Sequence, residues 1–307
     1  MKLIFSQTRI NVFSTTFFLL FIPVITFAQN NSADKKLFVQ DSLHLISDQF
    51  KFTEGPAVDA KGNIFFTDQP NNKIWKYDTN GALAVFMNES GRSNGLYFDH
   101  KGNLFACADE HNQIWCISTK GKVKVLLSDV EGKHFNGPND LWVDPQDGIY
   151  FTDPYYQRDY WTRTAPEIKG DKVYYLAKGK KAAVVATDQL IKPNGIVGSP
   201  DGKFLYVADI GAGKTYQFKI NADGSLSDQQ MIISKGSDGM TLDSEGNIYL
   251  TGKGVTIYNN KGTQIGHIDV PESWTANVCF GGKNRDQLFI TASKSVYTLP
   301  MQVHGVE

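Results

Sequence analysis

The chain contains the stretch Asp59-Ala-Lys-Gly-Asn-Ile-Phe-Phe-Thr-Asp68, which leads through a polar turn to Lys73-Ile-Trp-Lys-Tyr77. The same order returns in Asp99-His-Lys-Gly-Asn-Leu-Phe-Ala-Cys-Ala-Asp109 and Gln113-Ile-Trp-Cys-Ile117. In each copy a turn with Asp and Gly precedes an apolar strand, and a second turn precedes a second strand. Self-similarity of this kind indicates a repeat architecture.

Four further copies follow. They begin at Asp144, Ser199, Asp243 and Gly281, so that successive copies start 38 to 55 residues apart. This spacing is typical of four-stranded propeller blades, and no helical periodicity is sustained after the N-terminal region. The sequence therefore predicts an all-β fold, a six-bladed β-propeller with a central channel. A seven-bladed propeller of the WD type is disfavoured because its paired Gly-His and Trp-Asp signatures are missing.

We expect one propeller domain over residues 37–307. The segment Leu37 to Ser47 alternates apolar and polar residues, and it is predicted to complete the last blade and close the ring. The longest interval between copies holds Tyr155 to Gly170, an insertion rich in aromatic and charged residues.

The N-terminus has the features of a secretory signal peptide. Lys2 and Arg9 precede an apolar run from Phe13 to Phe27, and Ala28 is a small residue at the expected cleavage site. We expect residues 1–28 to be removed and residues 29–36 to be flexible. A membrane anchor is the competing interpretation, but the apolar run is short for a bilayer span. The mature protein is therefore expected to be exported, periplasmic or secreted, with no stable membrane insertion.

Composition excludes several classes of function. The chain has a formal net charge of -1 and is 41% hydrophobic, so it has a large core and lacks the basic surface that nucleic acid requires. Its three cysteines are too few for a disulfide framework. Cys107 and Cys116 fall in one predicted hairpin, where a bridge is conceivable, but two buried free thiols are the favoured interpretation.

Polar residues recur at one place in several copies, a few residues before the repeat turn. They are Glu54, Asn139 with Asp140, Asn194 and Asp238. Propellers direct such positions toward the central channel, and carboxylate and amide oxygens favour Ca²⁺, or Mg²⁺ or Mn²⁺ in its place. Taken singly, each is an ordinary turn dipeptide with Gly. One metal site is predicted because these residues occupy the same position in several copies of the repeat.

These motifs carry a family resemblance. Glu54-Gly-Pro, the stretch from Glu131 to Asp144 with Ile149-Tyr-Phe-Thr-Asp-Pro-Tyr155, Pro193-Asn-Gly-Ile196 and Ser237-Asp-Gly-Met240 resemble the SMP-30/gluconolactonase/LRE family. The resemblance covers essentially the whole chain after the signal peptide. It implies a hydrolase that opens a sugar lactone with metal-activated water, a metal-dependent lactonase among the carboxylic ester hydrolases.

The resemblance also implies the roles of the site residues. Glu54, Asn139, Asn194 and Asp238 hold one divalent metal, with Ca²⁺ expected and Mg²⁺, Mn²⁺ or Zn²⁺ as alternatives. Asp140 supports the site without binding the metal. Asp238 is the expected catalytic base, and its alternative role is that of a ligand alone.

Candidate substrate contacts come from two other regions. Arg92 and Asn94 precede the repeat turn of the second copy, at the same place in the repeat as the predicted metal ligands. Glu110 lies in the next loop of that blade. Tyr155 and Trp161, in the insertion, are expected to stack on a sugar ring over the channel mouth.

Two other functions remain open from the sequence. One is an arylesterase or phosphotriesterase-like hydrolase at the same site, and the other is a non-enzymatic propeller that binds Ca²⁺ or a sugar. The expected partner is a small-molecule lactone, and the expected oligomeric state is a monomer.

Overall fold

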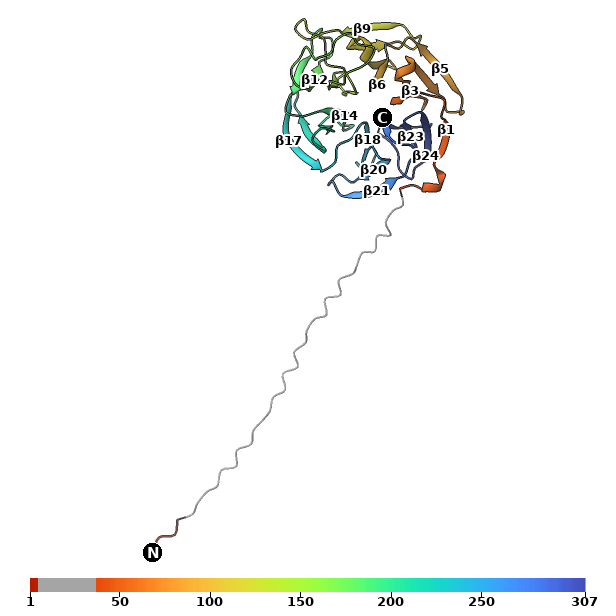
Figure 1. The fold of residues 1–307 in the computed structure, drawn as a ribbon. Helices are drawn as coiled ribbons and strands as arrows, with labels where there is room; N and C mark the ends of the chain where they lie inside the picture. The colour runs from red at the N-terminus through yellow and green to blue at the C-terminus, as the bar shows by residue number, and fades with distance from the viewer. Residues whose placement is uncertain (5–36, 307) are drawn as a thin grey trace. The chain divides into compact units, whose positions relative to one another are not determined.

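The computed structural model describes residues 1–4 and 37–306. Residues 37–306 form six four-stranded antiparallel sheets around a central axis, so the predicted six-bladed β-propeller is confirmed (Figure 1). The predicted signal peptide, residues 1–28, and the segment 29–36 lie outside the described residues except for residues 1–4.

The first three blades each contain four strands that are consecutive in the chain. Blade 1 comprises β2 (Thr53–Val58), β3 (Ile64–Asp68), β4 (Lys73–Tyr77) and β5 (Leu83–Asn88). Blade 2 comprises β6 (Ser93–Phe98), β7 (Leu104–Ala108), β8 (Gln113–Ile117) and β9 (Val123–Leu127). Blade 3 comprises β10 (Leu141–Val143), β11 (Ile149–Asp153), β12 (Lys172–Leu176) and β13 (Val184–Thr187).

The second half of the ring repeats this plan until its last strand. Blade 4 comprises β14 (Pro193–Gly198), β15 (Phe204–Asp209), β16 (Lys214–Ile220) and β17 (Leu226–Ile233). Blade 5 comprises β18 (Met240–Leu242), β19 (Ile248–Leu250), β20 (Val255–Tyr258) and β21 (Gln264–Ile268). Blade 6 comprises β22 (Thr275–Gly281), β23 (Gln287–Ala292), β24 (Ser295–Pro300) and β1 (His44–Ser47). Three short 3₁₀ helices lie between strands, η1 (Gln40–Ser42), η2 (Gln69–Asn71) and η3 (Asp109–His111).

The N-terminal strand closes the ring. β1 pairs with β24 in an antiparallel ladder in which His44 lies opposite Thr298 and Leu45 opposite Tyr297. A bridge between Phe38 and Met301 extends the contact toward the N-terminus. The prediction that this segment completes the last blade is confirmed. Pairing the first strand with the last blade satisfies an edge that would otherwise be open.

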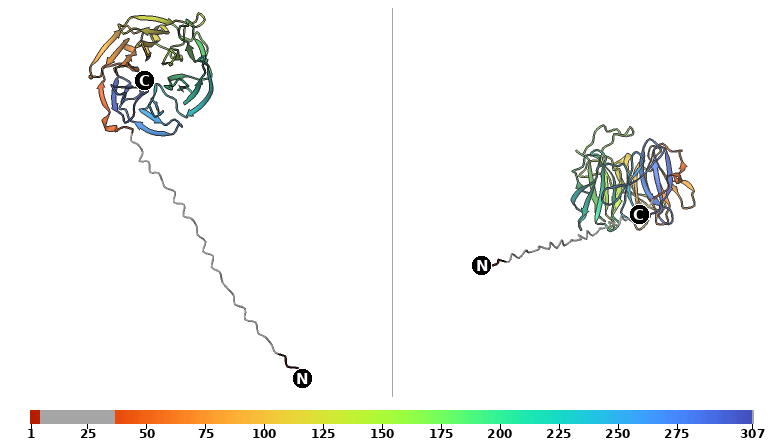
Figure 2. Two further views of the ribbon diagram at one scale, coloured as in Figure 1. Left: turned by 180° about the vertical axis from the view of Figure 1, so that it is seen from behind. Right: turned by 90° about the horizontal axis from the view of Figure 1, so that it is seen from below.

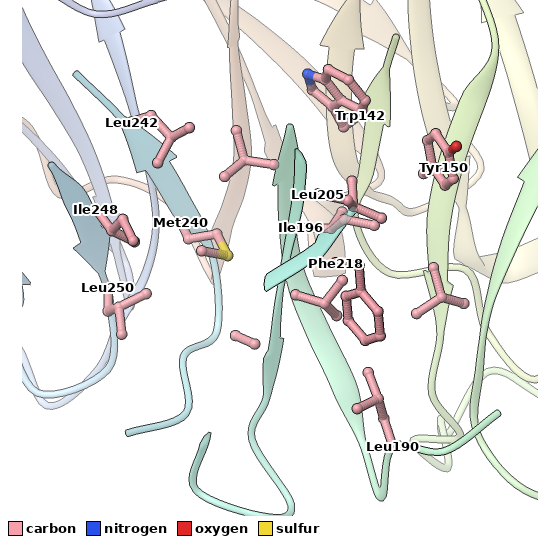
Figure 3. Close-up of a cluster of buried hydrophobic side chains, with 14 of the residues drawn as sticks. Trp142, Tyr150, Leu190, Ile196, Leu205, Phe218, Met240, Leu242, Ile248 and Leu250 are labelled. Carbon is pink, nitrogen blue, oxygen red and sulfur yellow. The ribbon is translucent and has the colours of Figure 1, made fainter. Parts of the chain in front are cut away.

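The core lies between the blades. The first strands β2, β6, β10, β14, β18 and β22 contact one another in cyclic order, and their residues are buried along almost their full length. Figure 3 shows one of the clusters between blades, where Trp142, Ile196, Phe218 and Leu242 come from three successive blades. Because each sheet is covered on both faces, its middle strands are continuous apolar runs rather than alternating ones.

Blades 6 and 1 meet through the buried ring of Phe289. Its centroid lies 5.4 Å from that of Phe66 and 5.9 Å from that of Tyr77. We expect Phe289→Ala to lower the free energy of unfolding by about 3 to 5 kcal/mol, because it removes buried area and leaves a cavity at the closure of the ring. Urea unfolding measures this. The matched control is Val125→Ala on an exposed outer strand, with an expected loss of about 0.5 kcal/mol or less. Equal losses in the two variants would contradict this account of closure.

The insertion 155–170 joins β11 to β12 without strand or helix. In the side view of Figure 2 a green loop, in the colour range of this insertion, rises above one face of the disc. Cys107, Cys116 and Cys279 are free thiols. For Cys107 and Cys116 this is the interpretation favoured from the sequence, although Cys116 is only partly buried. Among residues 1–4 and 37–306, no helix is long and apolar enough to cross a membrane.

Candidate active site

The first strands of the blades start in equivalent ways. In blades 1, 2, 4 and 6 the pairing of the first strand with the second is shifted near its start, for example between Glu54 and Ala57 and between Ser93 and Leu96. Such irregularities redirect side chains, here at the start of these four inner strands. Close to the start of the inner strand, each blade carries an equivalent residue at what we call the first inner-strand position. These residues are Glu54, Asn94, Asn139, Asn194, Asp238 and Ala276.

The next residue in each blade determines what fills the channel. It is glycine in four blades, Asp140 in blade 3 and Asn277 in blade 6. A Cβ at Gly95 would lie 2.4 Å from Oδ1 of Asp140, and one at Gly239 would lie 1.9 Å from Cγ of Asn277. The glycines therefore make room for these two side chains.

Asp140 and Asn277 meet between opposite blades of the ring. The Asn277 Nδ2 donates to Oδ2 of Asp140 at 3.3 Å, and both side chains are buried. We call this pair the channel floor. It lies between two cavities at opposite ends of the inner strands. We call the cavity at the starts of these strands the upper cavity and the one along their later residues the lower cavity. Asp140 and Asn277 line only the lower cavity.

The upper cavity is the candidate active site. Its volume is about 760 Å³, a size typical of small-molecule pockets. Glu54, Asn139, Asn194 and Asp238 all line it, so the structure brings together the four predicted metal ligands. The lower cavity, of about 420 Å³, is mainly lined by the later residues of the inner strands and by Val306.

Threonine hydroxyls at or just after the ends of the second strands fix the backbone of this site. Thr67 Oγ1 donates to the carbonyl of Asn94 at 3.1 Å, and Thr152 Oγ1 donates to that of Asn194 at 2.7 Å. Thr251 Oγ1 reaches the carbonyl of Ala276 at 2.8 Å in the same way. Each hydroxyl links one blade to the next, so the inner ends of the strands are held in place before any ligand binds.

Burial dominates the electrostatics of the site. It raises the pKa of Glu54 well above its ordinary value, and the neighbouring Asp238 carboxylate raises it further. Burial also raises the pKa of Asp238 to about 6 and that of Asp140 to about 7, against hydrogen bonds from Trp274 and Asn194 to the first and from Leu141 and Asn277 to the second. Three buried carboxylates close together favour the binding of a cation, because it offsets both their mutual repulsion and their desolvation.

The donor set fits a hard divalent cation. It offers two carboxylates and two amides, the oxygen donors that Ca²⁺ prefers. The Asn194 Nδ2 donates to Tyr156 Oη at 3.2 Å, which leaves the amide oxygen available to a metal. Within residues 1–4 and 37–306, no group of three His, Cys, Asp or Glu side chains has a metal-holding arrangement. A metal here would therefore depend on the two asparagines.

The raised pKa values predict how stability depends on pH in metal-free protein. Burial raises the pKa of Asp140 to about 7, that of Asp238 to about 6 and that of Asp153 to about 7. The folded state then binds more protons than the unfolded state between about pH 4 and 7, so stability falls as pH rises through this window, by about 1.4 kcal/mol per pH unit for each group. The pKa values of Asp147 and Asp201 are lowered to about 2, so these two are already ionised throughout the window.

Urea unfolding in EDTA at pH 4.5, 6 and 7.5 tests this dependence. We expect the midpoint to fall as pH rises, and added Ca²⁺ to raise it most at pH 7.5, where the site is ionised. A midpoint in EDTA that rises across the window would contradict the burial of these carboxylates as acids.

Trp274 orients Asp238. The indole Nε1 donates to Oδ2 of Asp238 at 2.6 Å, and the partly exposed ring lines the pocket from the loop before β22. The indole thus holds Oδ2, and a hydrogen bond from the Asn194 side chain also reaches this carboxylate. Trp274 was not singled out from the sequence, because it follows no Asp-Gly or Asn-Gly motif.

The structure separates the predicted substrate contacts of blade 2. Arg92 and Asn94 line the pocket. Glu110 does not, because its carboxylate pairs with Nε of Arg92 at 3.5 Å on the rim. Arg92 also donates to the carbonyl of Pro70 at 2.7 Å and lies over the ring of Tyr160, 4.7 Å from its centroid. Glu110 therefore contacts Arg92, which lines the pocket, and does not line the pocket itself.

The insertion covers the pocket with different residues from those predicted. Tyr155 and Trp161 do not line it. The Tyr155 hydroxyl bonds to Gln157, and the Trp161 Nε1 donates to the carbonyl of Asp109 at 3.0 Å, which turns both rings into contacts within the protein. The residues of the insertion that line the pocket are Tyr156, Arg158, Asp159 and Tyr160.

Comparison with known proteins bears on this geometry. The family model described as SMP-30/Gluconolactonase/LRE-like region matches residues 52–294. A gluconolactonase of Zymomonas mobilis is 25% identical over 303 residues, which cover 89% of this chain and 85% of the relative.

Solved structures give the same picture. One from Xanthomonas campestris, described as a gluconolactonase, is 28% identical with a TM-score of 0.78, covering 84% of this chain and 89% of the other. A regucalcin from Agrobacterium tumefaciens has the same fold, with 21% identity, a TM-score of 0.72 and coverage of 87% of this chain and 95% of the other.

Proposed function

The chain belongs to the SMP-30/Gluconolactonase/LRE-like family, and on that premise we propose that it is a metal-dependent lactonase that opens a sugar lactone in the upper pocket. The observation that carries the proposal is the convergence of Glu54, Asn139, Asn194 and Asp238 on one pocket large enough for a sugar ring. Relatives named as gluconolactonases align over most of the chain, which supports this reaction class.

We propose that these four residues hold one divalent cation, Ca²⁺ in the first place and Mg²⁺, Mn²⁺ or Zn²⁺ as alternatives. When bound, such a cation supplies a Lewis acid for the lactone carbonyl and lowers the pKa of water. The protein's own contribution is the preorganised ring of oxygens, which the threonine hydroxyls and the channel floor hold in place.

Asp238 is proposed as the general base. Water adds to the carbonyl carbon and gives a proton to the carboxylate of Asp238. The bond between that carbon and the ring oxygen then breaks, and the ring oxygen takes up the proton as a hydroxyl. In the metal-free protein burial raises the pKa of Asp238 to about 6, so this carboxylate is ionised near neutral pH.

The walls of the pocket are proposed to bind the sugar hydroxyls. Asn94 offers an amide, Arg92 a guanidinium on the rim, Tyr156 a ring and a hydroxyl, and Tyr160 a ring, since the Tyr160 hydroxyl is bonded to Asp109. Burial raises the pKa of Tyr156 to about 12, so its hydroxyl is a hydrogen-bond donor at neutral pH. These contacts combine an apolar surface with polar edges, as sugar sites require.

A pH-indicator assay on a substrate panel tests the reaction class. The panel contains δ- and γ-lactones of sugar acids, an aryl acetate and a phosphotriester, each corrected for spontaneous hydrolysis. We expect the highest kcat/KM on a sugar lactone. A higher kcat/KM on the aryl ester or the phosphotriester would replace this proposal with the corresponding esterase.

We also propose that the protein is exported, with residues 1–28 as the signal peptide. The charged start and the apolar run from Phe13 to Phe27 support this. N-terminal sequencing of the protein recovered from its source should begin at Gln29. A mature protein that begins at Met1 would contradict export by this route.

A further inference from the structure

Arg158 reaches into the active-site pocket from the insertion. It lines the same pocket as Glu54 and Asp238, and its charge interacts with both carboxylates. Its Nε donates to Oδ2 of Asp109 at 2.8 Å. Within residues 37–306 its two terminal nitrogens have no hydrogen-bond partner, and the side chain is 24% exposed. The guanidinium is therefore anchored at one edge and open at the other.

The anchor, Asp109, is itself unusual among the blades. The equivalent carboxylates in blades 1, 3 and 4 cap backbone N–H groups of the loop before their own first strand. They are Asp68 for Lys51 and Phe52, Asp153 for Asn136 and Gly137, and Asp209 for Ile191 and Lys192. These three carboxylates thus fix the loops that lead to Glu54, Asn139 and Asn194.

In blade 2 the loop before the first strand is capped by Asn72 instead. Asn72 Oδ1 accepts from the Ser90 Oγ at 3.2 Å and from the backbone N–H of Arg92 at 2.7 Å. The carboxylate of Asp109 is thereby released from its own loop. Its Oδ2 accepts from the side chains of Gln69 at 3.0 Å, Arg158 at 2.8 Å and Tyr160 at 2.5 Å. Asp109 is 1% exposed, so this is a built contact between blade 2 and the insertion.

The open edge of Arg158 matches the chemistry of the proposed reaction. Opening a lactone converts a neutral ester into a carboxylate, and negative charge develops on the carbonyl oxygen on the way. A guanidinium presents parallel N–H donors that fit a carboxylate, and a cation placed there stabilises the transition state more than the neutral substrate. The pocket lining also contains the carboxylates of Glu54, Asp159 and Asp238 and two other cations, Lys51 and Arg92, of which Arg92 is paired with Glu110.

We propose that Arg158 contacts the substrate, donating hydrogen bonds from its terminal nitrogens to the carbonyl oxygen in the transition state and to the carboxylate of the product. Asp109 is the positioning residue that holds it there. The inference rests on the proposed lactonase function for its transition-state part. Its binding part, recognition of a sugar-acid anion, can be tested without turnover.

Calorimetric titration with gluconate and with the neutral polyol sorbitol tests the binding part. We expect Arg158→Met to weaken gluconate binding at least 10-fold and to change sorbitol binding less than 2-fold. Lys178→Met is the matched control, because it removes one positive charge at an exposed ion pair with Asp147, and neither residue lines the pocket. Gluconate binding that is unchanged in Arg158→Met would overturn the proposal.

Kinetics tests the transition-state part. We expect Arg158→Met to lower kcat on a sugar lactone by about 10²-fold, as for loss of one oxyanion donor, with a smaller effect on KM. Asp109→Asn should lower kcat as well, and the double variant should lose little more than Arg158→Met alone, since both changes remove one function. Additive losses would overturn the positioning role of Asp109.

Tyr160→Phe separates positioning from folding. It removes one donor to Asp109 but keeps the ring under Arg92, so it should fold and lower kcat less than Asp109→Asn does. A kcat on Tyr160→Phe lower than that of Asp109→Asn would contradict the anchor. If wild type hydrolyses no lactone yet binds gluconate through Arg158, the proposed function fails while the anion site stands.

Discussion

Replacing Asp238 by Asn should lower kcat on a sugar lactone by about 10²- to 10⁴-fold even at saturating divalent metal. The amide cannot accept the proton that attacking water must lose. The substitution keeps the size of the side chain and one oxygen that can accept from the Trp274 indole, now 2.6 Å from Oδ2. The loss should therefore appear as a change in chemistry in a protein that melts at nearly the wild-type temperature.

Glu54→Gln is the matched control for this experiment. It also removes a buried carboxylate from the proposed metal site, but from a residue to which no proton transfer is assigned. Its activity should fall at low Ca²⁺ and recover as Ca²⁺ is raised to saturation, because only metal affinity is lost. If Asp238→Asn recovers in the same way, Asp238 is a ligand alone and the base lies elsewhere.

Exhaustive chelation should reduce lactone hydrolysis to the spontaneous rate. The lining of the pocket contains no serine or histidine that could replace a metal in polarising the carbonyl. Dialysis against EDTA followed by elemental analysis establishes the metal-free state. Adding Ca²⁺ should restore the rate, and the order of recovery among Ca²⁺, Mg²⁺, Mn²⁺ and Zn²⁺ identifies the preferred ion.

A structural readout accompanies the activity in this experiment. Trp274 donates to Asp238 and lines the pocket, so its fluorescence should change as the metal binds, and the change should be lost in Trp274→Phe. Full activity in protein that contains no divalent metal would contradict the metal-dependent mechanism.

The repeat made the fold predictable from sequence. Each copy carries its turn and its strand pair in the same order, and all but the sixth carry a polar residue at one equivalent position. Glu54, Asn139, Asn194 and Asp238 could therefore be assigned to one end of the channel from the sequence. Once six such units close into a ring, equivalent positions must converge, because symmetry leaves them no other place. The structure brings these four side chains to a single pocket in the same way.

The contents of the insertion could not be predicted in this way. Its residues belong to no repeat, so nothing in the sequence distinguishes Tyr156 and Tyr160, which line the pocket, from Tyr155 and Trp161, which do not. Tyr160 and Trp161 both donate to Asp109, and the carboxylate of Asp109 is released from its own loop because Asn72 caps that loop instead. Such contacts join residues far apart in the chain and leave no local pattern.

The channel floor corresponds to a residue pattern in the sequence. Five blades carry Gly or Asp after the first inner-strand position, and blade 6 carries Asn277 there, in a copy with no Asp-Gly or Asn-Gly motif. Comparing all six copies at that one position would have indicated that only blades 3 and 6 fill the channel. The hydrogen bond between Asn277 and Asp140 is the result.

The rate of glucono-δ-lactone opening by the purified protein in Ca²⁺, measured with a pH indicator and corrected for spontaneous hydrolysis, tests the central claim most directly. The account predicts acid release well above the spontaneous rate, proportional to enzyme concentration and abolished by EDTA. Folded, metal-replete protein that accelerates the opening of neither this lactone nor any other sugar lactone would contradict it.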